Sequence, residues 1–354
     1  MNNLAKQSIQ RMTPYAPPIE GRRSYAGWLL DFNERTVPYG VIAQEAIQLF
    51  ARENRMQYYP EYDDLKDRIG AYVNTKPENI LITNGSDQGI DIIFRTFTDK
   101  TDEVIIPSPS FAMFYQCATL SQNTIITPTY SPLSGSFPLD NILKAITKQT
   151  KLIIICNPNN PTGTLVSLTD IETILKKAKD AIVYVDEAYA EYTGVSAVSL
   201  VETYANLVIT RTFSKAFGLA SLRIGYVIAN EVLINEMKKV IGPYDVNMAG
   251  VYAVNMAMKD LSPLNRYVKE VMTFSKPMLE EFFLQESIPF YQSAADFILF
   301  KPKNPEQTFA CLKNNGFLTR PRKGYGFDGT IRVTAGTKKQ TKSFIQTYRD
   351  ICKI

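Results

Sequence analysis

The chain has 354 residues, of which 45% are hydrophobic and 21% charged, a composition typical of a globular protein rather than a disordered or fibrous one. Its 39 basic and 35 acidic side chains give a net charge of +4 and are scattered along the chain, which argues against nucleic-acid binding. No apolar run is long enough to span a bilayer.

The sequence contains no histidine and only four cysteines, which lie far apart. A zinc or haem site would lack its commonest ligand, so no metal is expected, and catalysts of the Ser-His-Asp or Cys-His type are excluded. Residues 1–12 have no apolar segment of the kind found in secretory signals. Together with the cysteine usage, this predicts a cytoplasmic protein.

The first part of the chain is predicted to be an arm, followed by alternating strands and helices. Prolines at 14, 17 and 18 favour extended geometry over residues 1–28. Strands are expected at residues 29–34, 79–83, 103–106, 124–127, 152–156, 181–185 and 206–210. Helices are expected at 42–52, 65–72, 84–97, 109–120, 139–146, 168–178 and 229–240. This alternation, with a wholly apolar strand at 152–156, predicts an α/β domain with a mainly parallel central sheet flanked by helices.

The last third of the chain has a different character. Helical patterns occupy residues 246–260, 265–285, 305–314 and 338–352, with short strands expected at 297–300, 317–319 and 330–334. We therefore expect a smaller α+β domain built from this part and the N-terminal arm. The predicted boundaries are 1–35 for the arm, 36–245 for the large, cofactor-binding domain, and 246–354 for the small domain.

The stretch RTFSKAFGLASLRIGY, residues 211–226, is the most informative part of the sequence. Lys215 follows a predicted strand and has hydroxyls at Thr212 and Ser214 before it and Arg223 after it. A lysine amine can form a Schiff base with a carbonyl cofactor, while hydroxyls and a guanidinium can hold a phosphate. The alternative is a surface lysine in a basic loop.

Two further loops follow predicted strands, where open α/β sheets bind ligands. Asn84-Gly-Ser-Asp87 opens a helix, so the backbone amides of Ser86 and Asp87 suit a phosphate, although an ordinary helix cap has the same composition. The run NPNNPTG at 157–163 forms a rigid turn that presents Asn160, or is a plain turn.

Asp186 ends the strand at 181–185, and a buried carboxylate there needs a cationic partner, such as a protonated pyridine nitrogen. Tyr189 lies one turn further on and could hydrogen-bond a phenolic oxygen of the same ring; a metal ligand or an N-cap is the alternative for Asp186. Phe111 could stack on a planar ring, although an aromatic residue there is more often part of the core.

Tyrosines and arginines outside these loops are weaker candidates. A hydroxyl of Tyr58 or Tyr59 could reach a phosphate or could pack at an interface. Arg320, and Arg332 inside an apolar strand, need anionic partners, and a bidentate grip on a carboxylate or phosphate is the usual arrangement. Arg322 and Lys323 are expected to form surface salt bridges.

Together these motifs resemble the histidinol-phosphate aminotransferase family, within the fold-type-I, class I/II pyridoxal-phosphate aminotransferases. The matches run in order over nearly the whole chain. They are L-x-x-N-E with P-Y-G, Y-P-x-x-x-x-L, N-G-S-D, N-P-N-N-P-T-G, V-D-E-A-Y, the lysine stretch, A-x-F-I-L, and R-P-x-x-G-Y-G with I-R-V-T-x-G-T.

The resemblance implies a role for each candidate residue around pyridoxal 5'-phosphate. Lys215 would hold the cofactor and shuttle the proton, Asp186 would pair with the pyridinium nitrogen, and Phe111 would stack on the ring. Asn160 and Tyr189 would contact the phenolic oxygen. The phosphate would be held by Ser86, Asp87, Thr212, Ser214 and Arg223, and by Tyr59 from the neighbouring subunit of a homodimer with shared sites. Tyr15, Arg320 and Arg332, with Asn160, would bind the substrate.

The implied reaction transfers an amino group from histidinol phosphate to 2-oxoglutarate, with glutamate as product, in histidine biosynthesis. The sequence departs from the family at Thr319, Ser221, Ala335 and Asp296, and a carboxylate at 296 would repel an anionic substrate if it faces that end of the site. These departures leave open an aromatic amino-acid aminotransferase or a threonine-phosphate decarboxylase.

Two other classes of protein fit less well. A dinucleotide-dependent oxidoreductase should carry G-x-G-x-x-G after an early strand, and the sequence has none. A cofactor-binding regulator should carry a fused DNA-binding segment, for which two domains in 354 residues leave no room.

Overall fold

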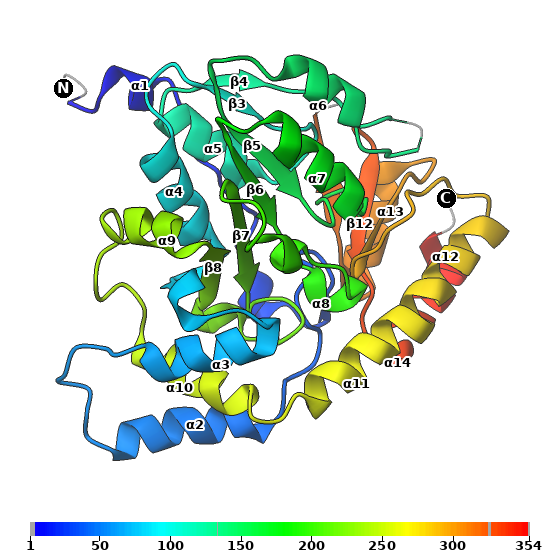
Figure 1. Cartoon of the computed structure of the whole chain (residues 1–354). Helices are drawn as coiled ribbons and strands as arrows, with labels where there is room; N and C mark the ends of the chain where they lie inside the picture. Colours follow the sequence, from blue (N-terminus) through cyan, green and yellow to red (C-terminus); the bar gives the residue numbers. More distant parts are fainter. Residues whose placement is uncertain (1–3, 133, 325–326, 353–354) are drawn as a thin grey trace.

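A seven-stranded sheet forms the centre of the computed structural model, which describes residues 4–132, 134–324 and 327–352 (Figure 1). Its strand order is β2-β8-β7-β6-β5-β3-β4. The strands are β2 (Ile80–Thr83), β3 (Glu103–Ile105), β4 (Thr124–Ile126), β5 (Thr150–Cys156), β6 (Ile182–Asp186), β7 (Leu207–Thr212) and β8 (Gly225–Ala229). Strand β8 runs opposite to the other strands of this sheet. The expectation of a mainly parallel sheet is therefore confirmed.

Helices cover both faces of this sheet. Along β5, Leu152 and Ile154 join one apolar cluster while Ile153 and Ile155 join the other, as the alternation of side chains along a strand requires. The first cluster is closed by α4 (Gly85–Phe97), α5 (Ala112–Leu120) and α9 (Glu231–Lys238). The second is closed mainly by α6 (Leu139–Ala145), α7 (Leu168–Lys177) and α3 (Asp63–Val73). Burial on both faces explains why β5 has no polar face.

Two small sheets join the C-terminal third of the chain to the N-terminal arm. Strands β11 (Arg320–Arg322), β12 (Thr330–Thr334) and β9 (Phe297–Phe300) form an antiparallel sheet in that order. Strand β1 (Trp28–Leu29) pairs in parallel with β10 (Phe317–Leu318). The arm therefore lies against the C-terminal part, as expected, while the division at residues 35 and 245 stays a prediction.

The remaining helices surround these sheets. They are α1 (Gln7–Gln10), α2 (Val41–Arg52), α8 (Ala190–Thr193), α10 (Met248–Ala257), α11 (Ser262–Glu270), α12 (Lys276–Gln285), α13 (Pro305–Asn314) and α14 (Lys338–Thr347). Helices α11 and α12 are joined by a π-helical turn and form one long rod, and α12 packs against β9 and α14 (Figure 1). In the described part of the chain, no helix is both long and apolar enough to cross a membrane.

Several predicted elements are wrong in the structure. The strand expected at 29–34 is reduced to Trp28–Leu29, and Asn33 has a left-handed φ of 55° that no strand accommodates. The helix expected at 229–240 begins only at Glu231, because Ala229 belongs to β8 and the Asn230 side chain caps the helix by accepting from the Leu233 amide at 3.0 Å. Strands β8 and β11 were not predicted, and the arm contains the short helix α1.

One buried ion pair ties β7 to the segment after β6. The guanidinium of Arg211 donates to Glu187 at 2.9 Å, and both side chains are almost fully buried. Glu187 also accepts from the Ser196 hydroxyl and the Ala197 amide, so its carboxylate is well satisfied.

We expect Arg211→Met to lower the free energy of unfolding by about 3–5 kcal/mol, because it leaves Glu187 buried without its cation. Chemical denaturation of the two proteins measures the difference. The double variant Arg211→Met/Glu187→Leu should recover most of the loss; a single-variant loss below about 1 kcal/mol would contradict this account.

Candidate active site

The sheet topology brings the candidate residues to one edge. Strands β5, β6 and β7 run in parallel, so their last residues, Cys156, Asp186 and Thr212, lie at the same edge. Antiparallel β8 starts there, and its first residue, Gly225, pairs with both Thr212 of β7 and Thr83 of β2. The loops that follow β2, β5, β6 and β7 therefore meet, in agreement with the rule that open α/β sheets bind ligands at their carboxyl ends.

A cavity of about 130 Å³ lies at this edge. It is lined by all the residues predicted to bind a cofactor except Tyr59, namely Ser86, Asp87, Phe111, Asn160, Asp186, Tyr189, Thr212, Ser214, Lys215 and Arg223. Cys156 and Ala188 also line it and were not predicted; their side chains are small and apolar, so no sequence signal marked them.

The Lys215 amine is held at the cavity by the arm. Its Nζ donates to the carbonyl oxygen of Phe32 at 2.8 Å and lies 5.8 Å from the ring centroid of Tyr189. Burial lowers the pKa of Lys215, with the nearby charge of Asp296 opposing the shift. A lysine with a lowered pKa has a larger neutral fraction and is a better nucleophile toward a carbonyl.

Asp186 is a buried carboxylate at the end of β6. Its Oδ1 accepts from the Ala188 amide at 3.0 Å, and burial raises the pKa of Asp186 to about 7. A cation bound in the cavity would favour the ionised form. The Tyr189 hydroxyl, which lines the same cavity, accepts from the Nδ2 of Asn33 at 2.9 Å. Asn33 was not among the predicted site residues, although it stands in the L-x-x-N-E motif.

The Arg223 end of the cavity gathers hydrogen-bond donors. Thr212 Oγ1 accepts from the Ser214 amide at 3.1 Å, and its hydroxyl donates to Ser214 Oγ at 2.9 Å. Ser86 lies in the first turn of α4, where backbone amides point outward. Arg223 has a left-handed φ of 56° and pairs with Asp87 at 2.9 Å. Hydroxyls, free helix amides and a guanidinium are the donors that phosphate groups prefer.

Two glycines allow this close approach of loops. A Cβ on Gly225 would lie 2.5 Å from the Gly85 carbonyl carbon and from the Ser86 nitrogen. A Cβ on Gly85, whose φ is +72°, would lie 2.5 Å from Nη2 of Arg223. Both positions therefore need glycine for the helix N-terminus and the arginine to meet.

The turn at 157–163 is rigid and exposes one amide to the cavity. Asn157 exchanges hydrogen bonds with the backbone of Val166, and Asn159 bonds Thr162 and the Pro109 carbonyl. The third asparagine of the turn, Asn160, lines the cavity, and its Oδ1 accepts a hydrogen bond from Nη1 of Arg332. This contact connects the cavity to the arginines of the small sheet.

The predicted substrate-binding residues lie next to one another. Arg320 and Arg332 are direct register partners on β11 and β12. The Tyr15 side chain interacts electrostatically with both, and its ring meets the edge of Phe111 at a centroid distance of 6.4 Å. The expectation that Arg322 forms a surface salt bridge is wrong: its side chain is half-buried, and it forms no ion pair with any residue that the structure describes.

Asp296 is fully buried, and both of its carboxylate oxygens lack a hydrogen-bond partner among the described residues. Burial raises the pKa of Asp296 to about 7, while the charges of Lys215 and Arg332 oppose the shift. Asp296 is not part of the cavity lining.

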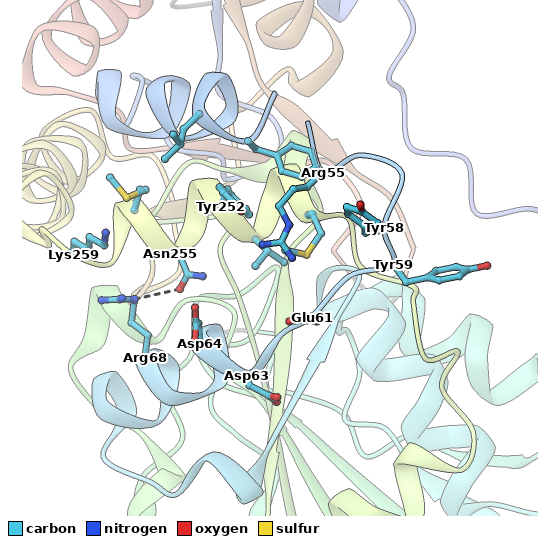
Figure 2. Close-up of a pocket in the computed structure, with 15 residues that line it drawn as sticks. Arg55, Tyr58, Tyr59, Glu61, Asp63, Asp64, Arg68, Tyr252, Asn255 and Lys259 are labelled. Atoms are coloured by element: carbon cyan, nitrogen blue, oxygen red, sulfur yellow. Dashed lines mark hydrogen bonds between the residues drawn. The ribbon is translucent and has the colours of Figure 1, made fainter. Parts of the chain in front are cut away.

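Tyr59 is not brought to the cavity of its own chain. It is 76% exposed, stacks on Tyr244 at 4.2 Å and borders a separate pocket of about 350 Å³ between α2, α3 and α10. Figure 2 shows its ring extending outward from the loop between α2 and α3. The predicted contact of Tyr59 with a cofactor phosphate can therefore be made only in the site of another subunit.

The fold and the lysine–aspartate cavity define an α/β enzyme of the aminotransferase type. The family model for aminotransferase class I and II matches residues 28–347, and the chain belongs to this family. It is 32% identical to the histidinol-phosphate aminotransferase of Thermoanaerobacter sp. (strain X514) over 99% of both chains. It is 30% identical to the histidinol-phosphate aminotransferase of Bacillus subtilis (strain 168), over 98% of this chain and 99% of that protein. The resemblance inferred from the motifs is thus confirmed.

A solved structure confirms the fold. The histidinol-phosphate aminotransferase from Sinorhizobium meliloti, in complex with pyridoxal-5'-phosphate, has a TM-score of 0.87 and 19% identity, with 99% of each chain covered.

Proposed function

We propose that this protein is a pyridoxal-phosphate-dependent aminotransferase that takes its amino group from histidinol phosphate and passes it to 2-oxoglutarate. The observation that carries the proposal is the cavity itself, in which a buried lysine amine, a buried carboxylate and a phosphate-binding set of donors line the same space. The relatives at 30–32% identity support the choice of substrate.

The residues of the cavity fit this cofactor. Pyridoxal phosphate supplies an aldehyde that condenses with amines and a ring that accepts the electrons of a broken Cα–H bond. Asp186 would hold the protonated ring nitrogen, and Phe111 would cover the ring. Asn160 and Tyr189 would orient the ring through its phenolic oxygen. Thr212, Ser214, Arg223 and the amides of Ser86 and Asp87 would hold the phosphate.

Lys215 acts as both nucleophile and base. Its amine would hold the cofactor through the aldehyde and would be the base that takes the proton from Cα of the substrate. The lowered pKa of Lys215 suits both tasks, because each requires the neutral amine. The substrate anion is held by Arg320, Arg332 and Tyr15, with Asn160 fixing the orientation of Arg332.

The proposal includes a cytoplasmic homodimer with shared sites. The surface between α2 and α3 exposes Met56, Tyr58 and Tyr59, each more than 60% accessible. Large apolar and aromatic side chains gathered in this way favour a protein interface. In the dimer, Tyr59 reaches the phosphate bound by the partner. Sedimentation equilibrium of the cofactor-loaded protein should give twice the mass of the chain, and a monomer at micromolar concentration would contradict this part.

An amine-donor screen tests the substrate. Cofactor-loaded protein is supplied with 2-oxoglutarate and with histidinol phosphate, histidinol, phenylalanine or threonine phosphate, and glutamate formation is measured. We expect kcat/KM for histidinol phosphate to exceed that for histidinol by about 100-fold or more, since arginine–phosphate hydrogen bonds contribute strongly. A preference for phenylalanine would contradict the proposal, as would release of carbon dioxide from threonine phosphate without a keto acid.

A further inference from the structure

A third arginine lies beside the two that are expected to grip the substrate. Arg322 stands two residues after Arg320 on β11, so their side chains leave the same face of the strand. Arg332 is the direct register partner of Arg320 and shares that face. The charges that act on Arg322 are those of Arg332, Arg320, Tyr15 and Tyr189, so its guanidinium lies toward the two substrate arginines. The residue also borders a separate pocket beside α13.

None of these three cations forms an ion pair with a carboxylate among the described residues, although Asp31 acts on Arg320 and Asp296 acts on Arg332 at longer range. Arg332 donates only to neutral groups, the amide oxygen of Asn160 and the carbonyl of Asp31, and its buried Nε has no partner there. Buried Nη1 of Arg320 is equally unsatisfied, and the guanidinium of Arg322 makes no hydrogen bond to that part of the chain. The nearby carboxylate of Asp31 is already held by Arg22 at 3.0 Å.

Mutual repulsion and burial make this arrangement unfavourable without an anion. Burial and the charges of Arg332 and Arg320 lower the pKa of Arg322 to about 10. One bidentate arginine suffices for a monoanionic carboxylate, whereas three guanidiniums match the three oxygens and double charge of a phosphate monoester.

We propose that Arg322 is a third anion-binding residue of the substrate site and that it makes the site select a dianionic phosphate over a carboxylate. The inference rests on the proposed function, of which it specifies the substrate class. Arg322 should therefore strengthen binding of the phosphate substrate more than binding of 2-oxoglutarate, whose terminal carboxylate carries a single charge.

The test compares Arg322→Leu with Lys323→Leu, which removes the same charge from the exposed neighbouring residue. Inorganic phosphate is titrated calorimetrically into the cofactor-loaded proteins, so that the cofactor's own phosphate site is filled. We expect Arg322→Leu to weaken phosphate binding by about tenfold or more, and Lys323→Leu by less than about twofold. In the kinetic assay, kcat/KM for histidinol phosphate should fall by a similar factor and that for 2-oxoglutarate by clearly less.

Thermal unfolding separates anion binding from a structural role. Removing a repelled cation should leave the Tm of Arg322→Leu unchanged or raise it, and Arg322→Gln provides the same charge change if the leucine variant does not fold. Equal phosphate binding by Arg322→Leu and Lys323→Leu would overturn the inference while leaving the aminotransferase proposal intact. If the Arg322 variant loses phosphate but histidinol phosphate is no donor of the natural protein, the anion site stands and the proposed substrate fails.

Discussion

Replacing Lys215 by alanine should reduce amino-group transfer by at least about 10⁴-fold, because the proposed mechanism gives this one amine the roles of both nucleophile and proton carrier. Its Nζ lines the cavity and is held by the Phe32 carbonyl at 2.8 Å. No other lysine side chain lines this cavity in the described part of the chain, so none is placed to substitute. Steady-state glutamate formation measures the loss.

A second readout tests the same residue without turnover. Borohydride reduction of the cofactor-loaded protein should fix the pyridoxyl group on the peptide that contains Lys215, as identified by mass spectrometry. Lys215→Arg is the matched control, since it keeps the cation but cannot take over the nucleophilic role, and it should also be inactive. A pyridoxyl group on a different lysine, or an alanine variant with substantial turnover, would refute the assignment.

The sequence predicted the elements that carry strong periodic patterns. Strands β9 and β12 have the predicted bounds of 297–300 and 330–334, since both are buried runs of apolar or β-branched residues, interrupted only by Arg332 in β12. Helix α13 matches its predicted range of 305–314 because Pro305 marks its start.

The missed elements lack such patterns. Strand β11 reads Arg-Pro-Arg, with two charges and a proline, and it is tolerated because it lies at the edge of its sheet. Strand β8 begins at Gly225 and ends directly before the helix cap at Asn230. Ala229 was expected to begin a helix, and no element was predicted for the rest of the strand.

The positions of the candidate site residues were predicted well where they follow strands and poorly where tertiary contacts decide. Asp186 and Lys215 could be placed together because strand ends converge in any parallel sheet. Arg322 was misassigned because its burial depends on β11 pairing with β12, which no local pattern shows. The support of Tyr189 by Asn33, 156 residues away in the chain, is likewise a product of the tertiary fold.

The Asp186→Asn substitution should have opposite effects on function and on the stability of the cofactor-free protein. Without its charge, residue 186 no longer stabilises a protonated ring nitrogen, and turnover should fall by about 10²- to 10³-fold. Cofactor affinity should also decrease. Absorbance titration with pyridoxal phosphate and steady-state kinetics measure these losses.

The stability effect follows from the sign of the pKa shift. In the folded protein the pKa of Asp186 is raised to about 7, above its unfolded value near 4, so between these values the folded state binds a proton that the unfolded state does not. The carboxylate therefore destabilises the cofactor-free protein progressively as pH rises from about 4 to 8, by on the order of 4 kcal/mol in total. Asparagine does not titrate, so the variant should unfold at higher denaturant concentration than the natural protein at pH 8, with a much smaller difference at pH 5.

Asp296→Asn is the matched control, because Asp296 is also fully buried and its pKa is also raised to about 7, yet it does not line the cavity. Relative to the natural protein, both variants should gain stability as pH rises. Turnover of Asp296→Asn should fall by less than that of Asp186→Asn, because residue 296 acts on the cavity only through the charges of Lys215 and Arg332. Equal losses of turnover in the two variants would show that Asp186 has no special relation to the cofactor. A pH-independent stability difference would show instead that neither carboxylate titrates near neutrality, so that a cation already balances both in the folded chain.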